Sequence, residues 1–416
     1  MNKKLNNIFK GDKVIWMVFF FLCIISVVEV FSASSELTYK GGNYLSPILK
    51  HIGILIVGVF FMVMTLNVKC KYFKILTPFL LLISFITLIW VFVAGQSTNG
   101  AQRWISFLGI QFQPSEIAKG TMVLATAQIL SATQTDKGAS KIAFKYIMYV
   151  CLFIIPPIMI ENLSTALLLC IVILFMMIIG RIPMKQIGKL LGGAALLIML
   201  ILGAVMTFGK NESEKNSPNN KTEVVHKEKG NLQKIFHRAD TWKSRIYKFA
   251  DDKPVPPEDV DLDKDAQVAY ANIAIASSNV VGKGPGNSVE RDFLSQAFSD
   301  FIYAIIIEEM GIFGAIIVAF LYIVLLFRTG RIARGCANSF PALLAMGLAL
   351  LLVTQAMFNM GVAVGWFPVT GQPLPLISKG GTSSIINCIY VGMILSVSRS
   401  AKKRETEHPE DASIKN

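Results

Sequence analysis

Long apolar runs recur along almost the whole chain, and short polar segments separate them. A helix needs roughly 20 largely apolar residues to cross the hydrocarbon core of a bilayer. The pattern therefore predicts an all-α polytopic membrane protein with about ten transmembrane helices. The predicted spans are 14–32, 48–67, 74–95, 115–132, 146–160, 163–180, 190–208, 301–327, 341–363 and 381–398.

Two of these spans, 146–160 and 163–180, are separated by very little polar sequence. Pro156 and Pro157 interrupt the apolar stretch, and the polar pair Glu161-Asn162 follows. Proline lacks the backbone N–H that an interior helical position donates. A re-entrant turn and one kinked helix are therefore alternatives to two separate crossings.

Lysine and arginine gather in alternate connections between the spans. Cytoplasmic loops of membrane proteins carry an excess of both residues. If the N-terminus is cytoplasmic, most basic residues of the short loops fall inside, and the short outer loops carry mainly Lys40, Arg103 and Lys379. Inner examples are Lys69, Lys71, Lys74, Arg328, Arg331 and Arg334. Omitting any one helix would destroy this alternation, so both termini are expected to be cytoplasmic.

The chain then divides into tails, helices and one large loop. The predicted parts are a cytoplasmic N-terminal tail (1–13), helices one to seven (14–208), a large extracytoplasmic loop (209–300), helices eight to ten (301–398) and a cytoplasmic C-terminal tail (399–416). Residues 210–230 are polar and lack periodicity, so we expect disorder there. Residues 267–278 have enough helix formers and apolar residues to form a helix on the membrane surface.

Composition agrees with a membrane as the main solvent. The chain is 53% hydrophobic and only 16% charged, whereas soluble domains carry about 25% charged residues. This excludes a soluble enzyme with one anchor. The net charge of +13 alone would suit nucleic acid, but the apolar runs favour anionic lipid headgroups as the partner, and no nucleic acid is expected. The six cysteines and four histidines show no disulfide or metal-binding spacing.

Ionisable side chains at membrane depth are costly, so they are candidates for function. The first such group joins Arg103 to the segment from Pro114 to Lys119. Proline is favoured at a helix start, and Glu116 and Lys119 would share one face of that helix. Two interpretations are possible: a local ion pair of these residues near the membrane interface, or a functional Lys119 that is desolvated in the bilayer.

The second group is Asp300 with Glu308. Asp300 ends the large loop at the start of a helix, where the helix dipole stabilises a carboxylate; a plain N-cap is the alternative. Glu308 lies about two helical turns further on and near the same face. We expect a polar cavity below Asp300, with Lys119 or Arg103 as counter-charges.

Two glycine-rich segments complete the candidates. The run Gly282-Lys283-Gly284 has no preceding strand, so a flexible turn is the default and a phosphate cradle the alternative. Residues 368–384 carry too many prolines and glycines for a continuous helix but are too apolar for an exposed loop. Broken backbone at membrane depth needs protein or a water-filled cavity around it. Lys379 and the residues after it offer a cation and backbone donors for an anion.

These four groups, in this order, resemble the SEDS family (shape, elongation, division and sporulation), the FtsW/RodA/SpoVE type of peptidoglycan polymerase. The resemblance spans roughly residues 14–400. The matching motifs are Arg103-Trp104-Ile105, Phe112-Gln113-Pro114-Ser115-Glu116, Gly282-Lys283-Gly284, Asp300-Phe301-Ile302, Glu308-Glu309-Met310-Gly311 and Pro368 to Ser384. Residues 29–35 are more similar to the division-type members.

The chain also departs from the family pattern. Glu161-Asn162-Leu163-Ser164-Thr165 stands where the family has P-D-x-G-T. Lys379 replaces a common aromatic residue, and Tyr270 replaces the second of two glutamines, of which Gln267 matches the first. These departures concern fine contacts with the substrate and leave the match at Asp300 intact.

The resemblance implies a glycosyltransferase that polymerises lipid II into β-1,4-linked glycan strands and releases undecaprenyl diphosphate. It implies action on the outer face of the cytoplasmic (inner) membrane, in septal cell-wall synthesis. Asp300 is then the expected catalytic base. Expected substrate-binding residues are Arg103, Glu116, Lys119, Gln267, Lys283, Glu308, Ser378 and Lys379.

No resident cofactor is expected from the resemblance, although a divalent cation (Mg²⁺ or Mn²⁺) stays open. Expected partners are the nascent glycan strand, a single-pass class B penicillin-binding protein, other divisome proteins and membrane lipids. Two other function classes are open: a lipid II flippase or transporter, because broken helices and intramembrane acids suit transport, and a noncatalytic scaffold for the penicillin-binding protein.

Overall fold

A computed structural model of the chain describes residues 10–33, 45–94, 96–98, 101–107, 110–136, 138–208, 262–294 and 299–407. The segment 210–230 and the outer parts of both tails lie outside these ranges. Ten long helices in the described ranges coincide with the ten predicted spans. They are α2 (Lys13–Ala33), α4 (Leu45–Asn67), α5 (Cys70–Ala94), α6 (Pro114–Ala132), α7 (Lys141–Glu161), α8 (Leu163–Ile179), α9 (Met184–Phe208), α12 (Ile302–Gly335), α13 (Ser339–Ala363) and α14 (Thr382–Glu407).

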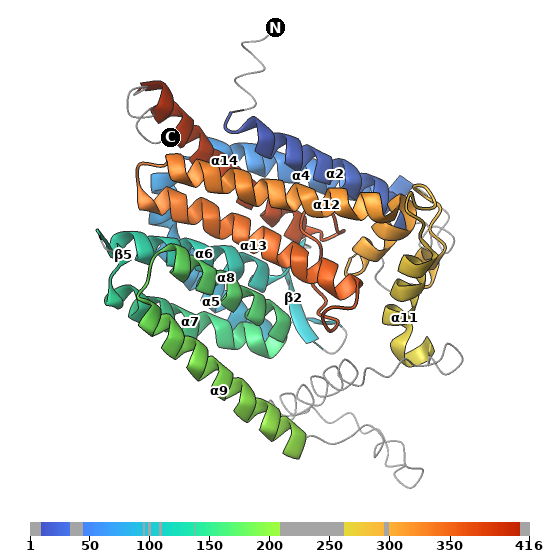
Figure 1. Cartoon of the computed structure of the whole chain (residues 1–416), viewed down its shortest axis with the longest axis horizontal. Helices are drawn as coiled ribbons and strands as arrows, with labels where there is room; N and C mark the ends of the chain where they lie inside the picture. The colour runs from blue at the N-terminus through green and yellow to red at the C-terminus, as the bar shows by residue number, and fades with distance from the viewer. Residues whose placement is uncertain are drawn as a thin grey trace.

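The helices pack side by side into one bundle (Figure 1). α12 packs against α13 and α2, and α14 packs against α4. α13 also contacts α6 and α8 and is one of the most buried helices, whereas few residues of α4, α5 and α7 are buried. α9 packs against α8 and runs diagonally away from the bundle (Figure 1).

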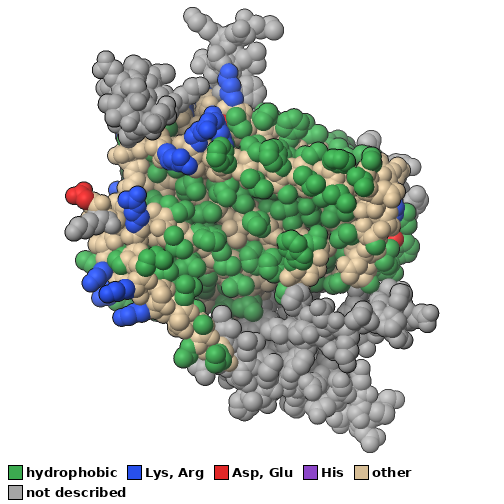
Figure 2. Space-filling model, in the orientation of Figure 1, with side chains coloured by type: hydrophobic (Ala, Val, Ile, Leu, Met, Phe, Trp, Pro, Cys, Tyr) green, Lys and Arg blue, Asp and Glu red, His purple; other side chains and the backbone are tan. Residues whose placement is uncertain are grey.

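The exposed belt of the bundle is apolar. Hydrophobic side chains cover the middle of the visible face, and Lys and Arg gather at its left edge (Figure 2). Seven helices in the described part are long and apolar enough to cross a membrane, and α8 is a shorter apolar helix. An apolar exterior is stable only in a hydrocarbon solvent, so the chain is a multi-pass membrane protein and the predicted fold class is confirmed.

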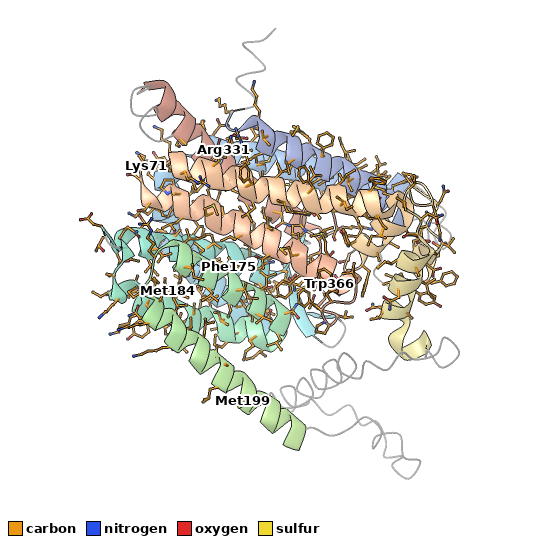
Figure 3. The ribbon with its side chains drawn as sticks, in the orientation of Figure 1. Lys71, Phe175, Met184, Met199, Arg331 and Trp366 are labelled. Carbon is orange, nitrogen blue, oxygen red and sulfur yellow. The ribbon has the colours of Figure 1, made fainter. Side chains whose placement is uncertain are left out.

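The two ends of the bundle differ, and we call them the basic end and the loop end. Lys71 and Arg331 mark the basic end, and Trp366 lies toward the loop end (Figure 3). At the basic end Lys10 and Arg399 both donate to Asn67 Oδ1. The start of α2 and the end of α14 therefore meet at the same end, as an even number of crossings requires. The loop end carries α11 (Leu262–Ser277) and the 3₁₀ turn η2 (Glu290–Asp292).

The structure decides between the alternatives for residues 146–180. α7 continues through Pro156 and Pro157 and ends at Glu161, where Asn162 caps α8 by accepting from the N–H groups of Ser164 (3.0 Å) and Thr165 (3.3 Å). The single kinked helix is therefore wrong, because a side-chain cap begins a second helix there.

The connection between α5 and α6 is not helical. It forms a small antiparallel sheet of β1 (Gln96–Thr98), β2 (Ala101–Phe107) and β3 (Ile110–Phe112), in the order β1-β2-β3. Ile105 pairs with Phe112 in this sheet. A second hairpin, β4 (Gln134–Thr135) with β5 (Gly138–Ala139), joins α6 to α7. The all-α prediction missed these strands because they are too short to leave a clear alternating pattern.

Candidate functional site

Residues 364–381, here called the broken segment, connect α13 to α14 without regular structure. Residues Leu374 to Ser378 are buried. Four side chains from three helices donate to backbone carbonyls of the segment, which satisfies groups that lack helical partners. These bonds are Asn359 to Gln372 O (2.7 Å), Gln355 to Pro373 O (3.0 Å), Tyr322 to Pro375 O and Ser26 to Ile377 O (2.6 Å). The prediction of broken backbone surrounded by protein is confirmed.

Asp300 lies beside the broken segment, directly before α12. Ser378 Oγ donates to the carbonyl of Ser299 (2.6 Å), and Asn359 Nδ2 donates to the carbonyl of Asp300 (2.8 Å). The Asp300 carboxylate accepts from Ser299 Oγ (3.1 Å) and is partly exposed. Phe301, not Asp300, occupies the N-cap position of α12. The plain N-cap alternative is therefore wrong.

Glu116 and Lys119 form a buried ion pair at the start of α6. Lys119 Nζ lies 2.8 Å from Glu116 Oε1, and both side chains are almost fully buried. Lys119 also donates to Gln355 Oε1 on α13 (2.7 Å). Lys119 Nζ thus contacts both Glu116 on its own helix and Gln355 on α13. The predicted ion pair is present, and Lys119 is also desolvated as the second alternative required.

Gln355 and Asn359 join these two regions. They lie one turn apart on α13, so they share a face of that helix. Gln355 connects Lys119 to the broken segment, and Asn359 connects the segment to Asp300. Sequence analysis missed both residues. The available signal was two amides four residues apart inside an apolar span, where polar groups are costly without partners.

Glu308 and Lys119 have different ion-pair partners. Glu308 Oε1 lies 2.6 Å from Lys283 Nζ, and the Glu308 carboxylate also accepts from the N–H of Val289 (3.0 Å) and from the hydroxyl of Ser288. The expectation of Lys119 as the counter-charge to Glu308 is therefore wrong, while that of Arg103 concerns a side chain outside the described part of the structure. α12 breaks at Gly311, shortly after the helical turn that bears Glu308.

The run Gly282-Lys283-Gly284 docks on this break. The N–H groups of Lys283 and Gly284 donate to the carbonyls of Glu308 (2.9 Å) and Glu309 (2.8 Å). Gly282 and Gly311 have φ of 81° and 67°, and a Cβ on Gly311 would lie 2.3 Å from Val280 O. Only glycine fits such a contact. The backbone donors are used within the protein, so the run is a docked turn and not a phosphate cradle.

Three further predicted site residues are Lys379, Gln267 and Arg103. Lys379 follows Ser378 and is half-buried; burial, and secondly the charge of Lys50 on α4, lower its pKa below the usual lysine range. Gln267 is a partly buried residue of α11, which packs against α12. Arg103 lies on β2, and its side chain is outside the described part of the structure.

The structure therefore brings Asp300, Ser378, Lys119 and Glu116 into one connected network through Asn359 and Gln355. Lys283 and Glu308 form a second polar group that fixes the outer loop. Lys379 lies near the end of the broken segment. It is the residue after Ser378, whose hydroxyl binds the turn that bears Asp300.

Comparison with known proteins identifies the family. The sequence model of the FtsW, RodA and SpoVE proteins, described as "cell cycle protein", matches residues 12–403. The chain belongs to the FtsW/RodA/SpoVE family. The family resemblance drawn from the motifs is thereby confirmed.

Individual members of the family match over almost their whole length. The chain is 29% identical to the probable peptidoglycan glycosyltransferase FtsW of Hahella chejuensis, over 95% of this chain and 92% of that protein. It is 26% identical to the peptidoglycan glycosyltransferase MrdB of Escherichia coli K12, over 93% of each chain.

Solved structures share the fold. A chain from a peptidoglycan synthase complex matches with a TM-score of 0.70 and 21% identity, over 94% of this chain and 98% of that one. The rod shape determining protein RodA of Thermus thermophilus matches with a TM-score of 0.63 and 20% identity, over 95% and 98%.

Proposed function

We propose that this chain is a peptidoglycan glycosyltransferase, which polymerises lipid II into β-1,4-linked glycan strands and releases undecaprenyl diphosphate. The family match over residues 12–403 carries this proposal, because relatives matched over nearly their whole length bear that activity in their names. The similarity of residues 29–35 to division-type members supports a role in septal synthesis.

Asp300 is the general base of the proposed reaction. It takes the proton from the 4-hydroxyl of the acceptor GlcNAc while that oxygen attacks the donor sugar carbon that carries the diphosphate. A positioned base contributes about 10²- to 10⁴-fold to such a step. Its support is the position of the Asp300 carboxylate, which is partly exposed at the loop end on a backbone held by Asn359 and Ser378.

Lys379 and Arg103 stabilise the negative charge of the leaving diphosphate. Burial and the charge of Lys50 both disfavour the charged form of Lys379 and so lower its pKa. An anion beside Lys379 and Lys50 would relieve the repulsion between their charges. This supports Lys379 as a group that binds the diphosphate.

Other predicted substrate contacts have partners within the protein. Lys119 pairs with Glu116, Lys283 pairs with Glu308, and Ser378 binds the carbonyl of Ser299. These bonds support roles in holding the site. Gln267 stays a predicted substrate contact.

A divalent cation, Mg²⁺ or Mn²⁺, stays a prediction. No group of three or more His, Cys, Asp or Glu side chains in the described ranges is arranged to hold a metal ion. A cation in this reaction would therefore be bound largely through the phosphates of the substrate, as Mg²⁺ often is. The proposed steps use only groups of the chain.

The proposal places the protein in the cytoplasmic (inner) membrane with Asp300 on the extracytoplasmic side. The basic end is then cytoplasmic, in line with the positive-inside rule. We also propose a single-pass class B penicillin-binding protein as the partner that crosslinks the new strands, with other divisome proteins around it.

The test is polymerisation of lipid II by the purified full-length protein in vesicles, with and without this partner. We expect Asp300→Asn to lower the rate by about 10²- to 10⁴-fold. Asp136→Asn, an exposed carboxylate at the basic end, should change the rate by less than about twofold. Full polymerisation by folded Asp300→Asn would remove Asp300 from this role. Movement of labelled lipid across the bilayer without glycan synthesis would instead identify a transporter.

A further inference from the structure

We infer that Asn359 and Ser378 are positioning residues that hold the Asp300 carboxylate in place for proton transfer. The inference rests on the proposed role of Asp300 as the base. Its observation is that two successive backbone carbonyls, those of Ser299 and Asp300, are each bound by a buried side chain from elsewhere in the chain.

No side-chain cap at the start of α12 holds the Asp300 turn. Asp300 precedes α12, and the N-cap residue Phe301 makes no side-chain capping bond. The carbonyls of residues 299 and 300 lie outside the regular bonding of that helix. A residue in such a turn can rotate about its backbone unless other groups bind it.

The two anchors are themselves rigid. Asn359 is 1% exposed and Ser378 is 2% exposed. The Asn359 amide also donates to the carbonyl of Gln372 (2.7 Å), and Ser378 Oγ also accepts from the N–H of Leu374 (2.7 Å). Both side chains therefore connect the Asp300 turn to the broken segment, which three helices hold in place.

Asn359 acts as a donor in this arrangement. An amide nitrogen carries two N–H groups, and both are directed at carbonyl oxygens, those of Asp300 and Gln372. Asn359 Oδ1 is buried and receives no hydrogen bond from the described residues. A carboxylate at this position would place an oxygen against the carbonyl oxygens of Asp300 and Gln372, and none of the three can donate a proton. Aspartate therefore has nearly the same shape as asparagine but cannot bind the two carbonyls.

The experiment measures kcat, KM for lipid II and the pH–rate profile of the full-length protein in vesicles. The variants are Asn359→Ala, Asn359→Asp and Ser378→Ala, with Asp300→Asn alongside. Asn387→Ala on α14 is the matched control, because Asn387 is also buried (3% exposed) and makes none of the contacts to the Asp300 turn described above. Thermal unfolding in detergent reports the folded fraction of each variant.

We expect each positioning variant to lower kcat on the order of 10- to 100-fold, because small displacements of a catalytic group are costly, while KM stays within about twofold. The pH profile should change shape. The wild-type rate levels off once Asp300 is ionised, whereas with a displaced base hydroxide must remove the proton and the rate keeps rising with pH. Ser378→Ala provides the same test if Asn359→Ala does not fold.

Two results would overturn the inference, and they are distinguishable. The first result is a wild-type kcat in the Asn359 and Ser378 variants, or a kcat lowered by the same factor at every pH. It would give these two residues a merely structural role, while an inactive Asp300→Asn would still support Asp300 as the base. Full activity of Asp300→Asn would refute the base assignment itself and remove the basis of the inference.

Discussion

Removing either charge of the buried ion pair of Glu116 and Lys119 should destabilise the protein, and the two single variants should differ in how much. The two charged atoms lie 2.8 Å apart. At an effective dielectric constant of about 20 their attraction is about 6 kcal/mol, which offsets the cost of removing both charges from water. Breaking a buried pair by removing one partner typically costs about 3–5 kcal/mol, because the other charge stays buried.

The partners left behind differ between the two single variants. After Lys119→Met, Glu116 loses its described side-chain partner, since its Oε2 already accepts no hydrogen bond in the described part of the chain. After Glu116→Gln, Lys119 keeps its 2.7 Å bond to Gln355. We therefore expect Lys119→Met to lower the free energy of unfolding by about 3–5 kcal/mol and Glu116→Gln to lower it by less.

The double variant Glu116→Gln with Lys119→Met should be more stable than Lys119→Met alone, because it leaves no uncompensated charge. The assay is reversible denaturation of the purified protein in mixed micelles. Lys74→Met, an exposed lysine on α5, is the control and should change stability by less than about 0.5 kcal/mol. Additive single effects, or a Lys119→Met protein within about 1 kcal/mol of wild type, would refute the reasoning.

Three more predictions concern the outer loop and the reaction. Gly311→Ala should destabilise the protein more than Gly286→Ala, because both have positive φ but only at Gly311 would the new Cβ meet another backbone; equal melting temperatures would contradict the docked turn. Burial, and secondly repulsion by Glu308, raise the pKa of Glu290. A raised folded-state pKa means that stability falls as pH rises above the unfolded value, so Glu290→Gln should raise the melting temperature at pH 7 and leave it unchanged at pH 4, about the ordinary glutamate pKa; a gain at both pH values would contradict this. EDTA should abolish polymerisation, with recovery on adding Mg²⁺ or Mn²⁺, if a cation bound to the substrate diphosphate is required; full activity in EDTA would remove the cation from the reaction.

The sequence by itself determined the features that depend on neighbouring residues. Runs of about 20 apolar residues define the ten spans because crossing a bilayer is a property of one continuous segment. The prolines and glycines of residues 368–384 excluded a continuous helix there, and α14 begins only at Thr382, since their effect on the backbone is local. Glu116 and Lys119 are three residues apart and share a helix face, so the sequence also indicated that they could form an ion pair.

Only the tertiary structure decided which distant groups meet. Lys119 binds Gln355, 236 residues away, and Asn359 binds the carbonyl of Asp300, 59 residues away. Glu308 binds Lys283, 25 residues earlier in the chain, which helical periodicity from Asp300 could not indicate. Buried polar groups in a membrane protein must find partners inside the protein, and those partners come from whichever helices pack alongside. Helix packing, which leaves no periodic signal in the chain, therefore determined how the Asp300 carboxylate is held.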